Sequence, residues 1–453
     1  MSKTQNAPQF NVNETKKFKF SNEQYYTLEI EYNRYIIYHS LIKQIENILK
    51  INNNTDSNIR KKYENKNIID RFILECINHG ITPQTEDVPI IRTNTLDTLE
   101  KSDTLEKDIN YEHLSRYLFL NTILDNPNKL NSIYYFIKMI SEYNEKKIGI
   151  TPDRILSIKN AFIDANKTFI VQNTKLKTIF VNTQSESSSS SSSSSSLSLS
   201  NISCSITLTQ DDYYVIKYKD YKKTINYKRY QKLIKNYDRP YPYDIINMIL
   251  RYSIFDMSNQ QWSIGENLYD NISDIFNISF EMFASPLNFN MNMFCSIFLD
   301  TDKIFGSVGS FYNLSIEKLL LQNIKGVFFN PPYLPLLMKQ CTKQCINILD
   351  NMNKLSNDFT IISFLPNWED ADYINSFITS KYVVDYKVVN KGNYILHEKD
   401  KGKLLKGTFD LLVIVLNSMK MNWDDKKKLE SIENVNHIIK LMKEETKELF
   451  YKK

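Results

Sequence analysis

Apolar residues in the first part of the chain recur at helical spacing. Residues 21–50, SNEQYYTLEIEYNRYIIYHSLIKQIENILK, follow this pattern behind Ser21, and Gln24 completes a capping box. Residues 65–80, 110–124 and 131–146 show the same periodicity. The pattern predicts a helical N-terminal region over 21–180, preceded by a disordered polar tail over 1–20.

Ten consecutive serines occupy residues 187–196. Such a run cannot bury apolar surface, so no packed core can form around it. It predicts a flexible Ser-rich linker over 181–204.

After residue 205, strand-like and helix-like segments alternate. Many are short apolar runs with little period-two alternation, as expected for strands that helices cover on both faces. We interpret as strands 277–284, 325–330, 359–366, 382–390 and 409–417, and as helices 243–255, 291–298, 334–349, 373–380 and 424–450, with strand-like residues and then a helix in 211–238. The pattern predicts a doubly wound α/β domain over 205–420 and a C-terminal helix over 421–453.

The net charge and the cysteine content limit the possible binding partners and the cellular compartment. The net charge is +5, from 57 Lys and Arg against 52 Asp and Glu, so nucleic acid would have to bind in a local groove rather than a chain-wide basic field. The five cysteines form no CxxC pair, which favours a reducing compartment and no metal. Without a signal-peptide core or a long apolar stretch, we expect an intracellular protein that does not bind a membrane.

The tetrapeptide Asn330-Pro331-Pro332-Tyr333 follows a predicted strand and precedes a predicted helix. Ligands of open α/β sheets bind at such carboxyl ends of strands. An adenine amine is a weak nucleophile, and the Asn330 side-chain oxygen with a proline-preceding carbonyl could accept its hydrogens. The prolines would stiffen the loop and Tyr333 would stack on the base. The alternative is an ordinary Pro-Pro turn.

A second loop could hold a cofactor. The strand-like FEMFA leads into Ala284-Ser285-Pro286-Leu287-Asn288, whose small residues would let a ligand approach the backbone. Residues 300–310, DTDKIFGSVGS, add Asp300 and Asp302, and a carboxylate near a strand end commonly holds a ribose diol. The alternatives are an ordinary Gly-Ser loop and solvated or capping aspartates.

Four segments, SFEMFASPLN, DTDKIFGSVGS, FFNPPYLPLLM and ISFLPNW, resemble in order and separation the phosphorylated-CTD-interacting factor family of cap-specific adenosine N6-methyltransferases. The resemblance covers about residues 205–418. It implies a Rossmann-like class I methyltransferase domain that uses S-adenosyl-L-methionine to methylate N6 of the 2'-O-methyladenosine beside the mRNA cap. The resemblance assigns catalysis to Asn330, Pro331, Pro332 and Tyr333, and cofactor binding to Ala284, Ser285, Pro286, Asn288, Phe305, Gly306 and Ser307.

The resemblance also implies partners and shows two departures. It implies the capped mRNA 5' end and the mRNA-capping or transcription machinery, in the nucleus or at a cytoplasmic site of capping. The family loop is typically NPPF, so Tyr333 adds a hydroxyl. The tryptophans are Trp262, Trp368 and Trp423, none in the N-terminal region, and we therefore expect no WW module.

Three further residues are candidates for substrate binding. Trp368 aligns with the family's proline-tryptophan element, although it could equally cap the sheet edge. Arg251 could contact RNA, or its positive charge could interact with the negative end of a helix dipole. His397, in what we interpret as a basic loop, could lie near cap phosphates or simply be exposed. A basic-aromatic patch over 221–232 could bind RNA or be a solvated helix face.

Two alternatives to cap-specific methylation remain open from the sequence. The same loop chemistry would serve an N6-adenine methyltransferase of DNA or internal RNA. A catalytically silent methyltransferase fold could instead bind RNA or a capping partner. The oligomeric state does not follow from the sequence.

Overall fold

The computed structural model describes residues 11–48, 152–186, 203–235, 242–253, 261–333, 335–368 and 371–450. The predicted helices at 65–80, 110–124 and 131–146 and the serine run at 187–196 lie outside these ranges. Within the described ranges, no helix combines the length and apolar character needed to cross a membrane.

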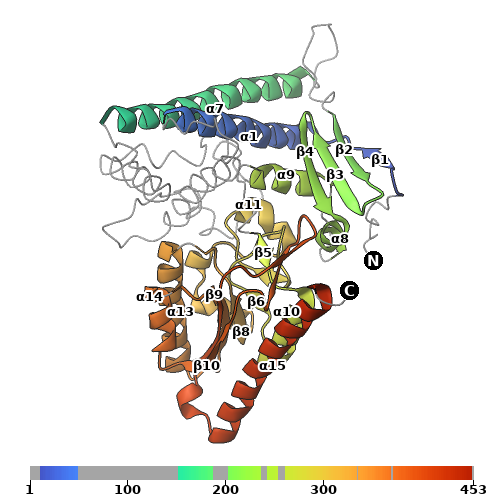
Figure 1. Cartoon of the computed structure of the whole chain (residues 1–453). Helices are drawn as coiled ribbons and strands as arrows, with labels where there is room; N and C mark the ends of the chain where they lie inside the picture. Colours follow the sequence, from blue (N-terminus) through green and yellow to red (C-terminus); the bar gives the residue numbers. More distant parts are fainter. Residues whose placement is uncertain are drawn as a thin grey trace.

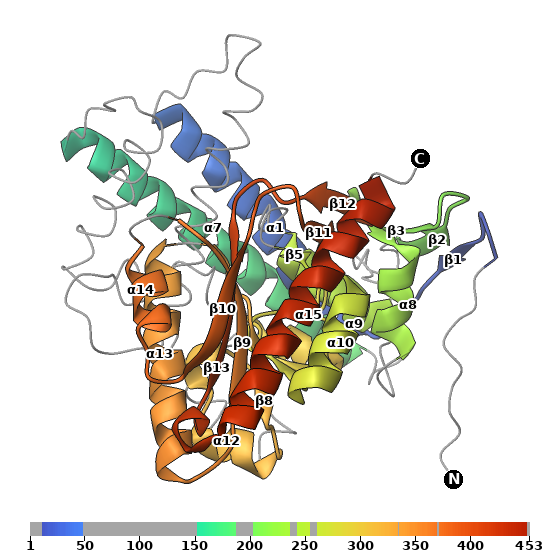
Figure 2. The same cartoon turned by 60° about the horizontal axis from the view of Figure 1, so that its bottom comes forward.

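Two long helices lie side by side along one flank of the molecule (Figure 1 and Figure 2). They are α1 (Asn22–Ile48) and α7 (Pro152–Glu186), and the Asn33 amide donates to the Asn173 side chain between them. The predicted capping box opens α1, because the Ser21 backbone N–H donates to the Gln24 side chain at 3.0 Å and the Gln24 N–H donates to Ser21 Oγ at 3.2 Å. The helical prediction is therefore confirmed for these described segments.

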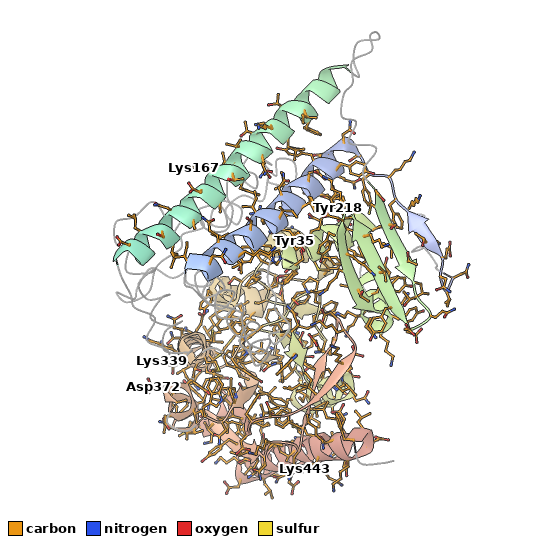
Figure 3. All side chains as sticks on the ribbon, turned by 45° about the horizontal axis from the view of Figure 1, so that its top comes forward. Tyr35, Lys167, Tyr218, Lys339, Asp372 and Lys443 are labelled. Atoms are coloured by element: carbon orange, nitrogen blue, oxygen red, sulfur yellow. The ribbon has the colours of Figure 1, made fainter. Side chains whose placement is uncertain are left out.

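A four-stranded antiparallel sheet packs against α1. Its order is β1-β2-β3-β4. The strands and the helices that follow them are β1 (Thr15–Lys17), β2 (Cys204–Leu208), β3 (Tyr213–Tyr218), β4 (Tyr221–Asn226), α8 (Tyr227–Lys235) and α9 (Pro242–Tyr252). Figure 3 labels Tyr35 and Tyr218 where α1 meets this sheet, and both rings contact sheet or helix aromatics across that boundary.

Three predicted boundaries differ from this arrangement. Residues 15–17 of the expected disordered tail form β1, which pairs with β2. Residues 181–186 of the expected linker continue α7. The strands between 204 and 226 form one sheet with β1 and share a core with α1 and α9, so they do not belong to the sheet of the α/β domain.

A six-stranded sheet forms the second half of the molecule. Its order is β10-β13-β9-β8-β6-β7, and β13 is antiparallel to both of its neighbours while the other pairs are parallel. Its strands are β6 (Phe280–Glu281), β7 (Met293–Phe294), β8 (Gly326–Phe329), β9 (Thr360–Pro366), β10 (Val383–Val389) and β13 (Leu411–Asn417). The α/β class is therefore confirmed.

Helices cover both faces of this sheet (Figure 2). One face carries α12 (Ile316–Leu321), α13 (Pro335–Lys354) and α14 (Asp372–Ile378). The other carries α10 (Glu266–Phe276) and α15 (Asp425–Phe450). The C-terminal helix is thus an integral layer of the α/β half, because its apolar stripe is needed to bury the sheet.

Smaller elements complete the described part of the chain. A three-stranded sheet has the order β12-β11-β5, and the short helix α11 and three 3₁₀ turns lie in loops. Their bounds are β5 (Trp262–Ser263), β11 (Ile395–Glu398), β12 (Lys403–Lys406), α11 (Leu299–Asp302), Lys303–Phe305, Phe311–Asn313 and Lys420–Asn422.

The segment 291–298 was predicted as a helix, and this prediction is wrong. The chain forms β7 there, parallel to β6. Met291, Phe294, Cys295 and Phe298 have helical spacing and are all buried. Periodicity alone does not separate a short buried strand from a buried helix, which explains the error.

The strand order reverses between β6 and β8. From β6 the chain moves to β7 on one side, then crosses to β8 on the other side and continues outward to β9. In open α/β sheets such a reversal leaves a crevice at the carboxyl ends of the two strands, where ligands bind. The fold therefore points to the loops after β6 and β8.

Candidate functional site

A pocket lies at this reversal, with walls formed by the loops after β6 and β8. It encloses about 1020 Å³, including space open to solvent. The lining side chains come from eight segments: Tyr252, Gln261, Trp262, Ser263, Tyr269, Glu281, Met282, Phe283, Ala284, Ser285, Asn288, Cys295, Ser296, Ile297, Ser310, Phe311, Asn330, Pro331, Pro332, Tyr333 and Leu396.

All four residues of the Asn330–Tyr333 loop line the pocket. β8 directly before it is completely buried, so the loop begins from a fixed strand end. The Tyr333 hydroxyl donates to Asn330 Oδ1 at 2.9 Å, and the Tyr333 ring meets Phe409 edge-on with centroids 5.5 Å apart. Burial raises the pKa of the Tyr333 phenol well above its ordinary value, so this group stays a neutral donor.

This hydrogen bond shapes what Asn330 can do. An amide oxygen has two acceptor positions, and the Tyr333 hydroxyl uses one of them. The second remains for another donor from the pocket. Because the hydroxyl must donate when its partner is the Asn330 oxygen, it also fixes which end of the amide is the acceptor.

The loop after β6 is held by its own polar side chains. The Ser285 backbone N–H donates to Asn288 Oδ1 at 2.8 Å, and the Leu287 N–H donates to Ser285 Oγ at 3.1 Å. Ser285 Oγ also donates to the Gln261 side chain at 2.7 Å. Ala284, Ser285 and Asn288 line the pocket as predicted for the cofactor side, but the two polar residues also close the turn.

Glu281 places a buried carboxylate on the pocket wall at the end of β6. It accepts hydrogen bonds from the Asn290 backbone N–H at 2.9 Å and the Asn290 side chain at 3.1 Å. Tyr269, which also lines the pocket, has its pKa raised well above its ordinary value by burial and then by this carboxylate. The site therefore contains an acidic group at the strand end nearest the reversal.

Arg229 fixes the outer side of the same loop. Its guanidinium donates to the Pro286 carbonyl from Nε at 3.0 Å and from Nη2 at 2.7 Å, and to the Phe289 carbonyl from Nη1 at 2.7 Å. It also lies 4.1 Å from the centroid of the Phe289 ring. Arg229 is buried, so this member of the basic-aromatic patch supports the pocket loop and does not present charge to solvent.

Four residues predicted to bind cofactor do not line the pocket. The Pro286 carbonyl accepts from Arg229, and the Phe305 side chain is fully buried in the core shared with α1. Gly306 ends a 3₁₀ turn at φ 99°, a conformation that favours glycine. Ser307 Oγ lies 2.7 Å from Ser296 Oγ. These four residues lie outside the pocket lining, and their role as direct cofactor ligands stays a prediction.

Asp302 also lies beneath the pocket and outside its lining. Tyr252 donates its hydroxyl to Asp302 at 2.6 Å, and the Thr301 hydroxyl donates to it at 2.9 Å. Burial raises the pKa of Asp302 to about 7, although these hydroxyls lower it in part. Because Tyr252 lines the pocket, Asp302 acts on the site through another side chain.

Arg251 does not contact the pocket. It donates to Glu31 of α1 from Nε at 2.7 Å and from Nη2 at 2.8 Å, and to Asp300 at 2.8 and 3.1 Å. Burial would lower the pKa of Arg251, but Asp300 and Glu31 raise it above its ordinary value. Both Arg251 and Asp300 are therefore members of a buried ion network outside the pocket lining, and substrate binding by Arg251 stays a prediction.

His397 and Trp368 have different surroundings from those expected. His397 belongs to β11, not to a loop, and its Nε2 lies 3.4 Å from the Glu445 carboxylate of α15, while its neighbour Leu396 points into the pocket. The expected loop is therefore a strand, and substrate binding by His397 stays a prediction. Trp368 follows β9 on the same sheet edge as the pocket, is 36% exposed and contacts Tyr373 edge-on. It stays a candidate outside the pocket lining.

The sequence did not reveal several lining residues. Gln261, Trp262 and Tyr269 come from β5 and α10, which precede the recognised segments. Glu281 carried a usable signal, because it stands at the carboxyl end of the strand that leads into the 284–288 loop. Gln261, Trp262 and Tyr269 reach the pocket only through packing between segments that are distant in the sequence, so no local sequence pattern identifies them.

The fold and the pocket define an α/β protein with a ligand site at a reversal of strand order. A family model described as "Phosphorylated CTD interacting factor 1 WW domain" matches residues 222–398. Over this stretch the chain is similar to the phosphorylated CTD interacting factor family.

Two curated relatives are similar to part of the chain. They are named mRNA (2'-O-methyladenosine-N(6)-)-methyltransferase and come from Mus musculus and Homo sapiens. Each is 28% identical over 124 residues, which is 27% of this chain. The chain matches only 16% of the length of each relative.

The matched model also bears on the expected absence of a WW module. Its description carries the WW name, so that expectation is corrected. In the structure, residues 222–398 include β6, β8 and the Asn330–Tyr333 loop. The family match and the candidate site therefore lie on the same stretch of chain.

Proposed function

We propose that this protein transfers the methyl group of S-adenosyl-L-methionine to N6 of adenosine, specifically the 2'-O-methyladenosine beside the mRNA cap. One observation carries the proposal: the Asn330–Tyr333 loop and the 284–288 loop line one pocket at the strand reversal. The sheet order, with antiparallel β13 between β9 and β10, supports a Rossmann-like class I methyltransferase domain.

The pocket lining fits S-adenosyl-L-methionine, which supplies an electrophilic methyl group on a sulfonium. Phe283 and Phe311, with ring centroids 4.7 Å apart, offer an apolar wall for the adenine ring. The Glu281 carboxylate offers an acceptor for ribose hydroxyls or an ammonium group. Ala284, Ser285 and Asn288 complete the cofactor side, and Arg229 fixes their loop.

The β8 side would position the nucleophile. Asn330 Oδ1 keeps one acceptor position and would take an N6 hydrogen, which orients the amine lone pair toward the methyl group. Pro331 and Pro332 hold the loop in place before substrate arrives. Tyr333 keeps the amide oriented and presents an aromatic ring to the base, and the N6 proton would leave late to solvent.

The relatives support the choice of adenosine in mRNA, since their names specify that reaction. The capped mRNA 5' end is accordingly the proposed substrate, with Trp368 at its margin. The capping or transcription machinery is the proposed partner, and the nucleus or a cytoplasmic capping site the proposed location.

The test is methyl transfer from labelled S-adenosyl-L-methionine to short RNAs that begin with capped 2'-O-methyladenosine, capped adenosine or uncapped adenosine. We expect N6-methylated product, preferentially with the first RNA, and loss of at least about 100-fold in Asn330→Ala. Cap-independent product, or product on DNA, would replace the cap-specific proposal with a general N6-adenine methyltransferase. RNA binding without any transfer would indicate a silent fold.

A further inference from the structure

A basic groove lies outside the candidate site, between the edge strand β10 and helix α15. It encloses about 930 Å³, including space open to solvent. Its lining side chains are Lys387, Val388, Asn436, Ile439, Lys440, Lys443, Glu444 and Lys447. Figure 3 labels Lys443 on α15.

The basic side chains of α15 form one stripe. Asn436, Lys440, Lys443 and Lys447 are separated by four, three and four residues, which places them on the same helix face. The Lys440 ammonium lies 3.8 Å from the Glu444 carboxylate and forms an ion pair with it. Within the described part of the chain, no carboxylate lies at ion-pair distance from Lys443 or Lys447, and both side chains are exposed.

Such a stripe is not favourable for the helix itself, because like charges three or four residues apart repel one another. An anionic ligand in the groove would remove that repulsion. The charge of the groove is therefore complementary to a chain of phosphates.

β10 adds one more lysine to these charges. Lys387 pairs with Val413 of β13, whose side chain belongs to the core under α15, so Lys387 faces α15, and its ammonium lies 3.3 Å from the Asp385 carboxylate. Val388 also lines the groove and is 43% exposed. Lysine side chains along a groove are the groups that contact a nucleic-acid backbone through its phosphates.

The position of the groove is compatible with an RNA strand that reaches the Asn330–Tyr333 loop. β10 and β9 are both antiparallel to β13, so they run parallel and their carboxyl ends share one edge of the sheet. That edge carries the Asn330–Tyr333 loop after β8. From Lys440 to Lys447 the stripe extends about 10 Å along α15, the length of about three stacked nucleotides.

We propose that the groove between β10 and α15 binds the single-stranded RNA that continues beyond the nucleotide presented to the Asn330–Tyr333 loop. This inference rests on the proposed function for its choice of RNA. The groove itself is tested by binding, which needs no methyl transfer.

The experiment measures fluorescence anisotropy of a labelled single-stranded RNA of about 20 nucleotides on the full chain, over a series of salt concentrations. We expect Lys443→Ala/Lys447→Ala to weaken binding about ten-fold and to reduce the slope of log Kd against log salt by about 1.4, since each phosphate contact contributes about 0.7. The matched control is Lys167→Ala/Lys175→Ala, two exposed lysines of helix α7 in the other half of the molecule. We expect less than a three-fold change there, by the same reasoning.

Equal losses in the two variants, or no loss in either, would overturn the groove assignment. Tighter binding of an acidic peptide than of RNA would overturn the choice of occupant. A second measurement separates this inference from the proposed function: the groove variant should raise KM for a long capped RNA and leave a capped dinucleotide unaffected. If the wild type methylates nothing while RNA binding still depends on Lys443 and Lys447, the groove stands and the proposed reaction fails.

Discussion

Charged and polar side chains have opposite surroundings in the two halves of the molecule. In the half built on α1 and the four-stranded sheet, Arg251 and Glu31 are buried and bind each other within an ion network. In the six-stranded half, Glu281 and Asn330 line a pocket. Residue type therefore does not separate structural from functional groups, whereas the partner of each group does.

The largest expected effect in this comparison is a loss of stability when the buried ion network around Arg251 is broken. Glu31→Gln keeps the shape but leaves Arg251 and Arg34 buried without a carboxylate on that side. We expect the free energy of unfolding in denaturant to fall by about 3–5 kcal/mol. The matched control is Lys339→Ala, which breaks the exposed pair with Asp372 and should cost at most about 1 kcal/mol.

Similar small losses in these two variants would break the comparison, since the buried charges would then contribute no more than surface ones. Figure 3 labels both Lys339 and Asp372.

The next effect lies where the two halves meet, at Asp302. Its pKa is raised to about 7, above the ordinary value of 3.8. The native state therefore binds this proton more tightly than the unfolded state, and the stability it contributes below about pH 4 is lost as pH rises through about 7. Relative to Asp302→Asn, the wild type should lose up to about 4 kcal/mol over that window.

Unfolding curves of both proteins at several pH values check this expectation. Parallel pH profiles for the wild type and Asp302→Asn would show that Asp302 titrates as an exposed carboxyl does, and would remove it as a support of Tyr252.

The smallest effect concerns Tyr333. Tyr333→Phe removes the hydrogen bond to Asn330 while the ring and the prolines remain. A neutral hydrogen bond contributes about 0.5–1.5 kcal/mol, so we expect methyl transfer to slow by no more than about ten-fold and stability to change by a similar energy. A loss of kcat far beyond this, with unchanged stability, would mean that the hydroxyl takes part in the reaction directly.

Much of the six-stranded half could be predicted because its central strands are short and mostly apolar. β8, β9 and β13 are almost completely buried, and such runs stand out between polar turns. The strand β1 could not be predicted, because three polar residues form it only by pairing with β2 at the far side of a long insertion. The β11–β12 hairpin contains several lysines and a glycine, so its sequence resembles that of a loop.

The same contrast between local sequence signals and long-range contacts applies to the candidate site. The Asn330–Tyr333 loop and Ala284, Ser285 and Asn288 were found because each lies directly after a strand end, a local signal. The ion pairing of Arg251 could not be predicted, because its partner Glu31 lies on another helix, 220 residues away in the sequence. Burial and pairing arise only from the folded chain, and no local pattern carries them.

The most direct test of the two-sided pocket is calorimetric titration of S-adenosyl-L-methionine into the wild type, Glu281→Gln and Asn330→Ala, with methyl transfer measured on the same samples. We expect Glu281→Gln to weaken cofactor binding by about 10-fold or more, because a charged acceptor is lost. Asn330→Ala should bind the cofactor within about three-fold of the wild type and yet transfer methyl groups at least about 100-fold more slowly. Unchanged cofactor affinity in Glu281→Gln together with wild-type transfer in Asn330→Ala would contradict the assignment of this pocket.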